Sequence, residues 1–284
     1  MKIRAPAKIN LFLNVRRRRP DGTHEIETLF ERVSLCDTLT LSPRKSGIKL
    51  ECSDPKIPSG PENLAFRAAA LLRAHTGVRK GVFIKLEKKI PVAAGLGGGS
   101  SDAAAVLLGL NRLWRLHLSK KKLRELAFEL GSDVPFFVLE TSFALGRGRG
   151  EILKRIPAHG RRIWHCLVKP PFGISTKAAY GALKTRHLTP QKPDAKMLLH
   201  SIQKGDVGTL SKLLANSLEL SLNKRVKTIF EIKESLKNQG AMASLMSGSG
   251  SSVFGVFGSM AAAFRASRFF RKRKGWQVFV TSTY

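Results

Sequence analysis

Residues Pro91-Val-Ala-Ala-Gly-Leu-Gly-Gly-Gly-Ser-Ser-Asp-Ala-Ala-Ala105 form a glycine-rich loop that runs directly into an apolar helical segment. Glycine tolerates positive φ and lets a ligand approach the backbone. We expect a serine to cap the helix that follows, at about 101–114. A helix N-terminus offers amide groups and a positive dipole end to a phosphate. The stretch therefore predicts a site for a phosphorylated ligand, with a nucleotide as the first expectation; the alternative is a glycine/serine turn that binds nothing.

The two commonest nucleotide-binding motifs do not fit this loop. A P-loop needs lysine followed by serine or threonine after its last glycine, but Ser100 and Ser101 follow Gly99 directly. A dinucleotide fingerprint needs an acidic residue about 20 positions further on, where Lys120–Lys122 stand. The loop therefore belongs to another class of phosphate site.

Bulk composition indicates a globular chain of one large or two medium domains. The chain has 284 residues, 43% of them hydrophobic, a length that allows either division. The three cysteines, Cys36, Cys52 and Cys166, are few, odd in number and widely spaced. We therefore expect neither a disulfide framework nor a zinc site. We also expect the protein to be located in the cytoplasm, where cysteines stay reduced. No apolar run approaches the roughly 18 residues of a membrane span. Polar residues interrupt Met1–Val15, which excludes a signal peptide there.

The formal net charge of +30 raises the possibility of a nucleic-acid or anionic-membrane partner. The basic residues are spread along the chain instead of forming one patch. The main clusters are Arg16–Arg19, Lys88–Lys89, Lys120–Lys122 and Arg265–Lys274. We therefore expect a general anion-attracting field around a phosphate-binding enzyme, with no specific nucleic-acid partner and no membrane.

Strand and helix patterns are mixed without regular βαβ repetition, which favours an α+β fold. We expect domains at 1–157 and 161–284, with Pro157–Gly160 as the linker. The first has strands near 9–15, 38–41, 82–90, 143–145 and 151–156, an extended or mixed segment at 25–33, and helices near 63–75, 101–114 and 119–130. The second has strands near 163–168, 253–257 and 277–281, and helices near 176–184, 194–203, 207–217, 224–238 and 259–273.

Two charged residues are candidates for phosphoryl-transfer chemistry, which needs a phosphate cradle, a cation and a group that orients or deprotonates the acceptor. Lys8 lies on a strand whose period-two pattern puts Asn10 on the same side. The alternative for Lys8 is an ordinary exposed lysine. Asp133 lies among apolar residues between Gly131 and Pro135, and its alternative is a helix N-cap.

Three further features have both a structural and a functional interpretation. Ser247–Ser252 is a second loop of small residues, which is either a tight connection or a backbone that approaches the ligand of the first loop. His24 follows a turn, and Tyr180 is one of two tyrosines. Taken alone, His24 is a surface or structural residue and Tyr180 a core or edge aromatic.

The motifs taken together resemble the GHMP kinase superfamily. The lysine-containing strand, Pro91–Ser101 and Met246–Phe254 occur in the family's order, and the glycine loop is its diagnostic motif. Further segments resemble one kind of kinase within this superfamily, and they span nearly the whole chain. They are Ala5–Asn14, Arg19–Leu29, Glu62–Leu64, Gly131–Phe137, Gly146–Glu151 and Pro170–Thr176. The resemblance implies a ribosomal protein S5 domain 2-like N-terminal domain and a ferredoxin-like C-terminal domain. It also implies ATP-dependent phosphorylation, with Mg²⁺, of the 2-hydroxyl of a cytidine-diphosphate-linked methylerythritol, in the non-mevalonate route to isoprenoid precursors.

The resemblance also assigns roles to residues. It implies that Asp133 and Lys8 are catalytic, and that Asn10, His24 and Tyr180 contact the substrate. On the nucleotide side it implies Asn63, Lys88, Pro91, Val92, Ala93, Ala94, Gly95, Leu96, Gly97, Gly98, Gly99, Ser100 and Ser101. No magnesium ligand is identified, and the oligomeric state is open.

One residue departs from the family pattern. Thr23 stands where the family usually has an aromatic that stacks on cytosine, and losing that face, if no other residue replaces it, costs about 1–3 kcal/mol of affinity. Phe172 is a candidate replacement. Three rivals remain: a non-catalytic sensor, a nucleic-acid-binding protein, and a kinase for another alcohol such as homoserine or mevalonate.

Overall fold

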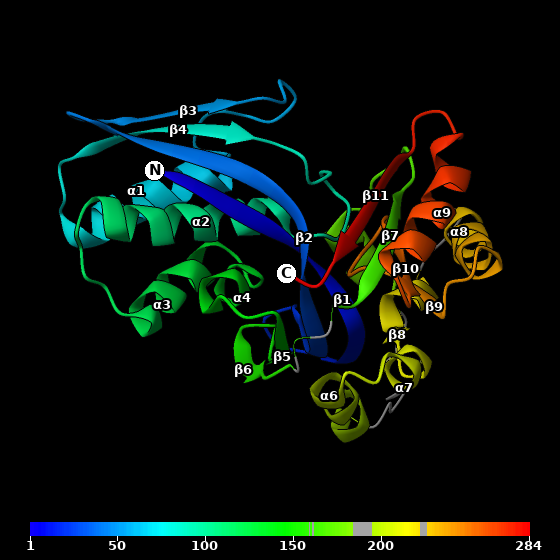
Figure 1. Ribbon diagram of the computed structural model, residues 1–284. Coiled ribbons are helices and arrows are strands. Elements are labelled where there is room, and N and C mark those ends of the chain that lie inside the picture. The colour runs from blue at the N-terminus through cyan, green and yellow to red at the C-terminus, as the bar shows by residue number, and fades with distance from the viewer. Residues whose placement is uncertain (159, 161, 184–194, 222–225) are drawn as a thin grey trace. The chain divides into compact units, whose positions relative to one another are not determined.

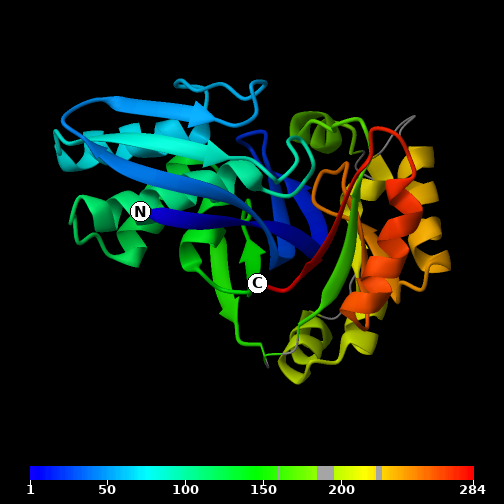
Figure 2. The same cartoon turned by 45° about the horizontal axis from the view of Figure 1, so that its top comes forward.

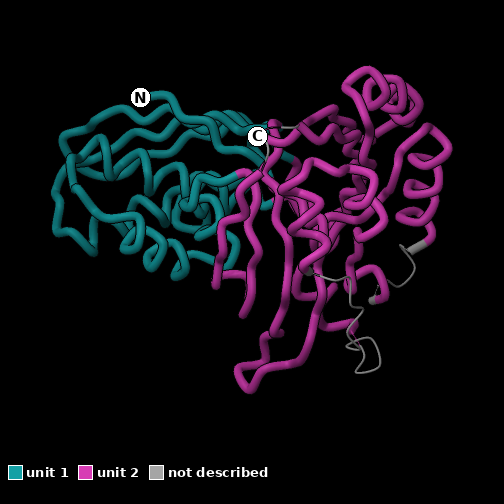
Figure 3. The backbone as a smooth tube through the Cα atoms, turned by 60° about the horizontal axis from the view of Figure 1, so that its bottom comes forward, with its two compact units in different colours: residues 1–7, 35–90, 97–141 teal, residues 8–34, 91–96, 142–284 magenta. Residues whose placement is uncertain are grey.

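The computed structural model describes residues 1–158, 160, 162–183, 195–221 and 226–284. The chain forms two compact units that are interleaved in sequence (Figure 3). Unit 1 holds residues 1–7, 35–90 and 97–141, and unit 2 holds residues 8–34, 91–96 and 142–284. Strands β1 (Lys2–Arg18) and β2 (His24–Arg44) contribute residues to both units. The expected division at 157 and 161 stays a prediction.

Unit 1 combines strands with helices on one face of them (Figure 1). Strand β4 pairs antiparallel with β2, Leu41 opposite Ile84, and β3 pairs parallel with β4, Leu50 opposite Ile84. The elements that lie wholly in this unit are β3 (Ile48–Cys52), α1 (Leu64–Thr76), β4 (Gly81–Glu87), α2 (Gly98–Leu113), α3 (Lys120–Leu130) and α4 (Val134–Leu139). Residues 101–107 of α2 are all buried, so the apolar run after the glycine loop forms the centre of this unit's core.

Local sequence signals explain where the helices of unit 1 begin and end. Asn63 caps α1, its Oδ1 accepting a hydrogen bond from Ala65 N, and Gly77 ends that helix in the left-handed conformation. Ser119 caps α3 in the same way, with Lys122 N as donor, and Gly131 follows the helix. These boundaries confirm the expectations from the sequence.

Unit 2 contains a four-stranded antiparallel sheet in the order β11-β7-β10-β9. Numbered along the chain, β7, β9, β10 and β11 give the order 4-1-3-2, which with helices α8 and α9 in the two crossovers is the ferredoxin-like arrangement. Both helices pack on this sheet (Figure 2), which confirms the expected C-terminal fold. The elements of this sheet and its helices are β7 (Trp164–Lys169), α8 (Val226–Asn238), β9 (Ala243–Met246), β10 (Val253–Phe257), α9 (Met260–Arg271) and β11 (Gln277–Ser282).

The rest of unit 2 includes the parts of β1 and β2 that belong to it, and two further strands pair with them. Strand β5 pairs antiparallel with β2 and with β6, and β8 pairs parallel with β1, Phe12 opposite Ala215. These elements are β5 (Phe143–Arg147), β6 (Ile152–Ile156), α5 (Thr176–Gly181), α6 (Ala195–Lys204), α7 (Val207–Lys212), β8 (Ala215–Asn216) and a 3₁₀ helix at Ser217–Ser221. No helix within the described ranges is long and apolar enough to cross a membrane.

Several expected boundaries were wrong. The segments 25–33 and 38–41 belong to the single strand β2, and the helix expected at 207–217 ends at Lys212 because Ala215–Asn216 pairs with β1. Strands β3 and β9 and the short helix α4 were not expected. Parts of the expected linker and of three helices, at residues 159, 184, 194 and 224–225, lie outside the described residues.

Candidate functional site

The glycine-rich loop enters helix α2 earlier than the sequence indicates. The helix begins at Gly98, and Gly97, with a φ of 66°, occupies the N-cap position. Ser100 and Ser101 lie inside the first turn, so the expected serine cap is wrong: glycine reaches the left-handed conformation at this N-cap without steric cost. The first helical hydrogen bond runs from Ser101 N to Gly97 O over 2.9 Å. The amides before it point out of the helix end, as an anion-binding helix N-terminus requires.

The second small-residue loop lies against the first. Ser247 Oγ donates to Gly95 O over 3.0 Å, and Ser252 N donates to Ala94 O over 3.2 Å. A Cβ added at Gly95 would stand 2.0 Å from Ser247 O, and the φ of Gly95 is +75°. Only glycine fits this position, and the two loops form one backbone surface in unit 2.

Lys8 begins the unit 2 part of β1, and its side chain is buried. Only 4% of Lys8 is exposed, because residues 5–15 are buried on both faces of the strand. Its Nζ donates to Asn10 Oδ1 over 2.7 Å, and Asn10 Nδ2 donates to Thr28 Oγ1 over 2.8 Å. The alternative of an ordinary exposed lysine is therefore wrong, and Lys8 and Asn10 share one side of the strand as expected.

The Lys8–Asn10 pair also lies beside the second loop. A Cβ added at Gly248 would stand 3.1 Å from Asn10 Oδ1 and 3.3 Å from Lys8 Nζ. The backbone amide of Lys8 donates to Leu96 O over 3.0 Å, which joins β1 to the glycine-rich loop. An ammonium, an amide and two backbone loops thus converge in unit 2, a combination suited to an anionic ligand.

Asp133 occupies the N-cap position of α4 in unit 1, just before Val134 and Pro135. Its backbone is helical, with φ −84° and ψ −18°, and its side chain makes no capping hydrogen bond to a described amide. A typical N-cap residue is extended and accepts from the amide two or three residues on. Asp133 therefore has the position of a helix N-cap, but its carboxylate does not act as the cap of α4.

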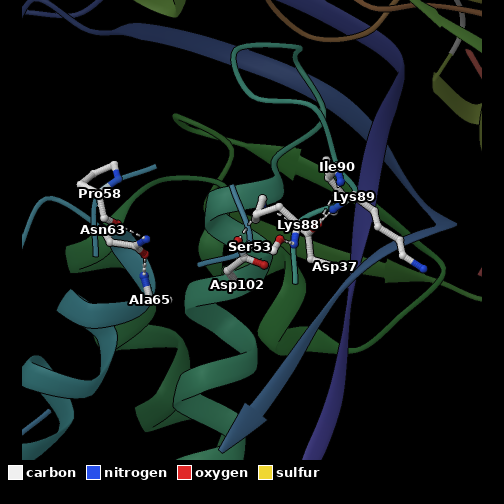
Figure 4. Close-up of polar contacts among 9 residues, drawn as sticks. All are labelled: Asp37, Ser53, Pro58, Asn63, Ala65, Lys88, Lys89, Ile90 and Asp102. Atoms are coloured by element: carbon white, nitrogen blue, oxygen red, sulfur yellow. Dashed lines mark hydrogen bonds and ion pairs between the residues drawn. The ribbon is translucent and has the colours of Figure 1, made fainter. Parts of the chain in front are cut away.

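Asn63 and Lys88 are both held by the protein in unit 1 (Figure 4). Asn63 caps α1, and its Nδ2 donates to Pro58 O over 2.8 Å. Lys88 Nζ donates to Asp37 and, over 2.8 Å, to Asp102 Oδ2. Burial acts to lower the pKa of Lys88, but the carboxylates of Asp102 and Asp37 outweigh it and raise that pKa. Burial raises the pKa of Asp102 to about 7, with Asp37 adding to the rise and Lys88 opposing it.

Asp37 was missed from the sequence although it is fully buried. Its Oδ1 accepts from Lys89 N over 2.5 Å and from Ile90 N over 2.8 Å. Asp37 is the one acidic residue of the segment 33–41 of β2, where apolar residues predominate, and that position was the available signal, since buried aspartates require partners.

His24 and Tyr180 lie together in unit 2. Their ring centroids are 5.3 Å apart, with a 37° interplanar angle. Burial, and then the charge of Arg18, lowers the pKa of His24, which favours a neutral imidazole. Thr23 donates from both its N and its Oγ1 to Asp21 Oδ1 in the preceding turn. Phe172 packs against the apolar core of unit 2, and its proposed stacking role stays a prediction.

The described residues contain no cluster of three or more histidine, cysteine, aspartate or glutamate side chains that could hold a metal ion. Mg²⁺ in phosphoryl-transfer sites is bound through one or two carboxylates and substrate phosphates, with water completing its shell. Such a site does not require a cluster of that kind, and no described residue is assigned to Mg²⁺.

Comparison with known proteins gives matches over the whole chain. Profiles of the N-terminal and C-terminal domains of GHMP kinases match residues 63–141 and 198–274. The chain is 46% identical over 284 residues to a 4-diphosphocytidyl-2-C-methyl-D-erythritol kinase of Pelotomaculum thermopropionicum, covering 99% of this chain and 96% of that protein.

Solved structures agree with these matches. A crystal structure of a 4-(cytidine 5'-diphospho)-2C-methyl-D-erythritol kinase superposes with a TM-score of 0.86 at 38% identity, covering 100% of both chains. A homoserine kinase from Cytophaga hutchinsonii gives a TM-score of 0.78 at 19% identity, covering 100% of this chain and 94% of the other, and shares the fold alone. The two-domain fold expected from the sequence is confirmed.

Proposed function

This chain belongs to the GHMP kinase family, and we propose that it transfers the γ-phosphoryl group of ATP to the 2-hydroxyl of 4-diphosphocytidyl-2-C-methyl-D-erythritol. The observation that carries this proposal is the full-length similarity, 46% identity over 99% of the chain, to a kinase named for that substrate. The substrate places the reaction in the non-mevalonate supply of isoprenoid precursors.

ATP phosphates are proposed to bind at Pro91–Ser101, at the N-terminus of α2. Gly95 and Gly97 both have a positive φ, a conformation in which backbone amides can turn towards an anion, and the helix N-terminus adds its dipole. Asn63 and Lys88 are proposed on the nucleotide side. Mg²⁺ supplies charge neutralisation of the phosphates when it is bound, and no protein ligand is assigned to it.

Asp133 is proposed as the group that accepts the proton of the substrate hydroxyl. The hydroxyl oxygen then bonds to the γ-phosphorus, and the bond from that phosphorus to the β–γ bridging oxygen breaks, releasing ADP. Lys8 is proposed to stabilise the negative charge that spreads over the transferred phosphoryl oxygens. The 2.7 Å hydrogen bond to Asn10 holds the Lys8 ammonium in place.

Asn10, His24 and Tyr180 are proposed to contact the substrate, with the two rings beside the cytosine. The 5.3 Å separation of the His24 and Tyr180 centroids supports a shared aromatic site. Thr23 supplies no stacking face, so we expect weaker cytidine binding than in relatives that have an aromatic there.

The other functional classes have less support. Buried Lys8 and a non-capping Asp133 favour an enzyme over a sensor. We also propose that the protein acts in the cytoplasm on a small molecule, with no specific nucleic-acid or membrane partner; the three cysteines form no disulfide within the described residues.

The test is ADP release by the purified protein with Mg²⁺–ATP and a panel of alcohols. Release with the cytidine-diphosphate substrate, at least about 100-fold faster than with homoserine or mevalonate, supports the proposal. ADP release with only a different alcohol would support a kinase that acts on another acceptor. ATP binding without release for any alcohol supports the sensor.

A further inference from the structure

The two ends of the glycine-rich loop are packed together within unit 1. Ile90 immediately precedes the loop, and Gly98 begins helix α2 at its other end. A Cβ added at Gly98 would stand 2.9 Å from Ile90 Cγ2 and 3.3 Å from Lys88 Nζ. The backbone of α2 therefore rests directly on the segment that leads into the loop.

A buried network of side chains from three elements holds the two ends of the loop together (Figure 4). Lys88 Nζ, at the exit of β4, bridges Asp37 on β2 and Asp102 on α2. The side-chain exposures of Lys88, Asp37 and Asp102 are 8%, 0% and 3%. Asp37 Oδ1 also accepts the amides of Lys89 and Ile90, and Lys88 N donates to Ser53 Oγ over 2.9 Å. The chain is thus held on both sides of the loop, at residues 88–90 and at residue 102.

This arrangement is costly as a purely stabilising device. Two carboxylates and one ammonium are withdrawn from water, and desolvation of buried charges commonly exceeds their mutual attraction. The raised pKa of Asp102, to about 7, reports that cost. Asp102 Oδ1 moreover has no hydrogen-bond partner among the described residues. A buried ion pair is therefore weak evidence for stability in itself, and the contacts that this network makes with the backbone at residues 89 and 90 point to the geometry that it imposes.

We propose that Asp37, Lys88 and Asp102 form a loop clamp, which holds the two ends of the phosphate loop in register so that Lys88 acts on ATP binding as a positioning residue. The inference rests on the proposed function only in taking ATP as the ligand of the loop. Within the clamp, Lys88 donates one hydrogen bond to Asp37 and one to Asp102. Its effect on ATP binding is transmitted through the backbone of residues 88–102.

The clamp is tested by a double-mutant cycle on ATP affinity. Lys88→Met removes the ammonium and keeps the aliphatic chain, and Asp102→Ala removes its partner. ATP dissociation constants are measured by calorimetry without acceptor, and KM for ATP and for the alcohol are measured at steady state. Glu51→Gln is the matched control, because it breaks the exposed Lys49–Glu51 pair of the same unit.

The clamp predicts that Lys88→Met and Asp102→Ala each weaken ATP binding by tenfold or more. It also predicts that the double variant binds ATP as tightly as the single variant with the larger loss. KM for the alcohol stays within twofold, and Glu51→Gln behaves as the parent. Additive losses of 100-fold or more in the double variant would overturn the clamp and make Lys88 a direct ligand of ATP. Unchanged ATP affinity with lower thermal stability would also overturn it, leaving a structural role alone.

Folding defects do not remove the test. If Lys88→Met or Asp102→Ala loses its native circular dichroism, the same cycle is run with Lys88→Gln and Asp102→Asn, which retain hydrogen bonds without charge. Because ATP affinity is measured without acceptor, a wrong acceptor assignment leaves the result intact. Failure of the clamp and failure of the proposed reaction are therefore distinguishable.

Discussion

Ser247 Oγ donates a hydrogen bond to Gly95 O over 3.0 Å, and so joins two glycine- and serine-rich loops that are 152 residues apart in the chain. Gly95 and the second loop share one backbone surface, and Gly248 brings the same surface beside Lys8 and Asn10. The phosphate site proposed at the glycine-rich loop therefore depends on how closely these two loops approach.

Gly95→Ala should abolish ATP binding, because its Cβ would stand 2.0 Å from the backbone oxygen of Ser247 and its φ of +75° is unfavourable for alanine. We expect a loss of about 2–4 kcal/mol in the free energy of unfolding, measured by urea denaturation. The matched control is Gly77→Ala, which has a φ of +67° and no atom within 4 Å of the added Cβ. It should lose only about 1–2 kcal/mol and keep its activity. Equal losses in the two variants would contradict the close approach of the loops.

Asp133→Ala should lower kcat by about 10²–10⁴-fold, the range for loss of a general base. ATP affinity should stay within threefold, since the carboxylate is proposed to act on the acceptor hydroxyl. The control is Asp206→Ala, because Asp206 caps α7 through Thr209 N. Loss of that cap should cost about 1 kcal/mol of stability with no effect on kcat. Near-normal turnover by Asp133→Ala would remove the base assignment.

Thr23→Phe should lower KM for the cytidine substrate about fivefold or more, because a base–aromatic stack contributes about 1–3 kcal/mol. KM for ATP should not change. Thr23→Val separates the new ring from loss of the hydrogen bond between Thr23 Oγ1 and Asp21, which measures 2.5 Å. If valine improves KM as much as phenylalanine does, stacking is not the cause.

Asp102→Asn should alter the pH dependence of stability. Burial raises the pKa of Asp102 from 3.8 to about 7, so between these values the folded state retains a proton that the unfolded state releases. Wild-type stability from this group is therefore lost as pH rises from 3.8 to about 7 and is constant above that range.

Asparagine does not ionise, so the Tm of Asp102→Asn relative to wild type should rise by roughly 3 °C or more between pH 5 and pH 8. Calorimetric scans across that range check it. Parallel Tm curves for the variant and the wild type would mean that Asp102 does not titrate near neutral pH. Glu51→Gln, at an exposed position, should give such a parallel curve.

The fold could be predicted from the sequence where short-range interactions determine it. Asn63, Gly77 and Ser119 mark helix ends by capping, and the caps form as expected. The ferredoxin-like order of unit 2 followed from the family resemblance and is present in the strand pairing.

The errors arose where tertiary contacts override local pattern. The period-two pattern around Lys8 left an ordinary exposed lysine as the alternative, but pairing and packing bury both faces of residues 5–15 of β1, and with them Lys8. The helix start at Gly98 was missed because glycine has low helix propensity, which the packing of α2 overrides. Asp37 became recognisable only when β2 and the exit of β4 were brought together. Nothing in the order of residues indicates which segments will converge around a buried lysine.

The most direct test of the proposed reaction is ³¹P NMR of the product formed from Mg²⁺–ATP and 4-diphosphocytidyl-2-C-methyl-D-erythritol. We expect one new phosphate monoester resonance coupled to the carbon that bears the 2-hydroxyl, stoichiometric ADP, and an intact diphosphate linkage. A monoester at another carbon would contradict the assigned hydroxyl. ADP and inorganic phosphate without any monoester would contradict the transfer itself.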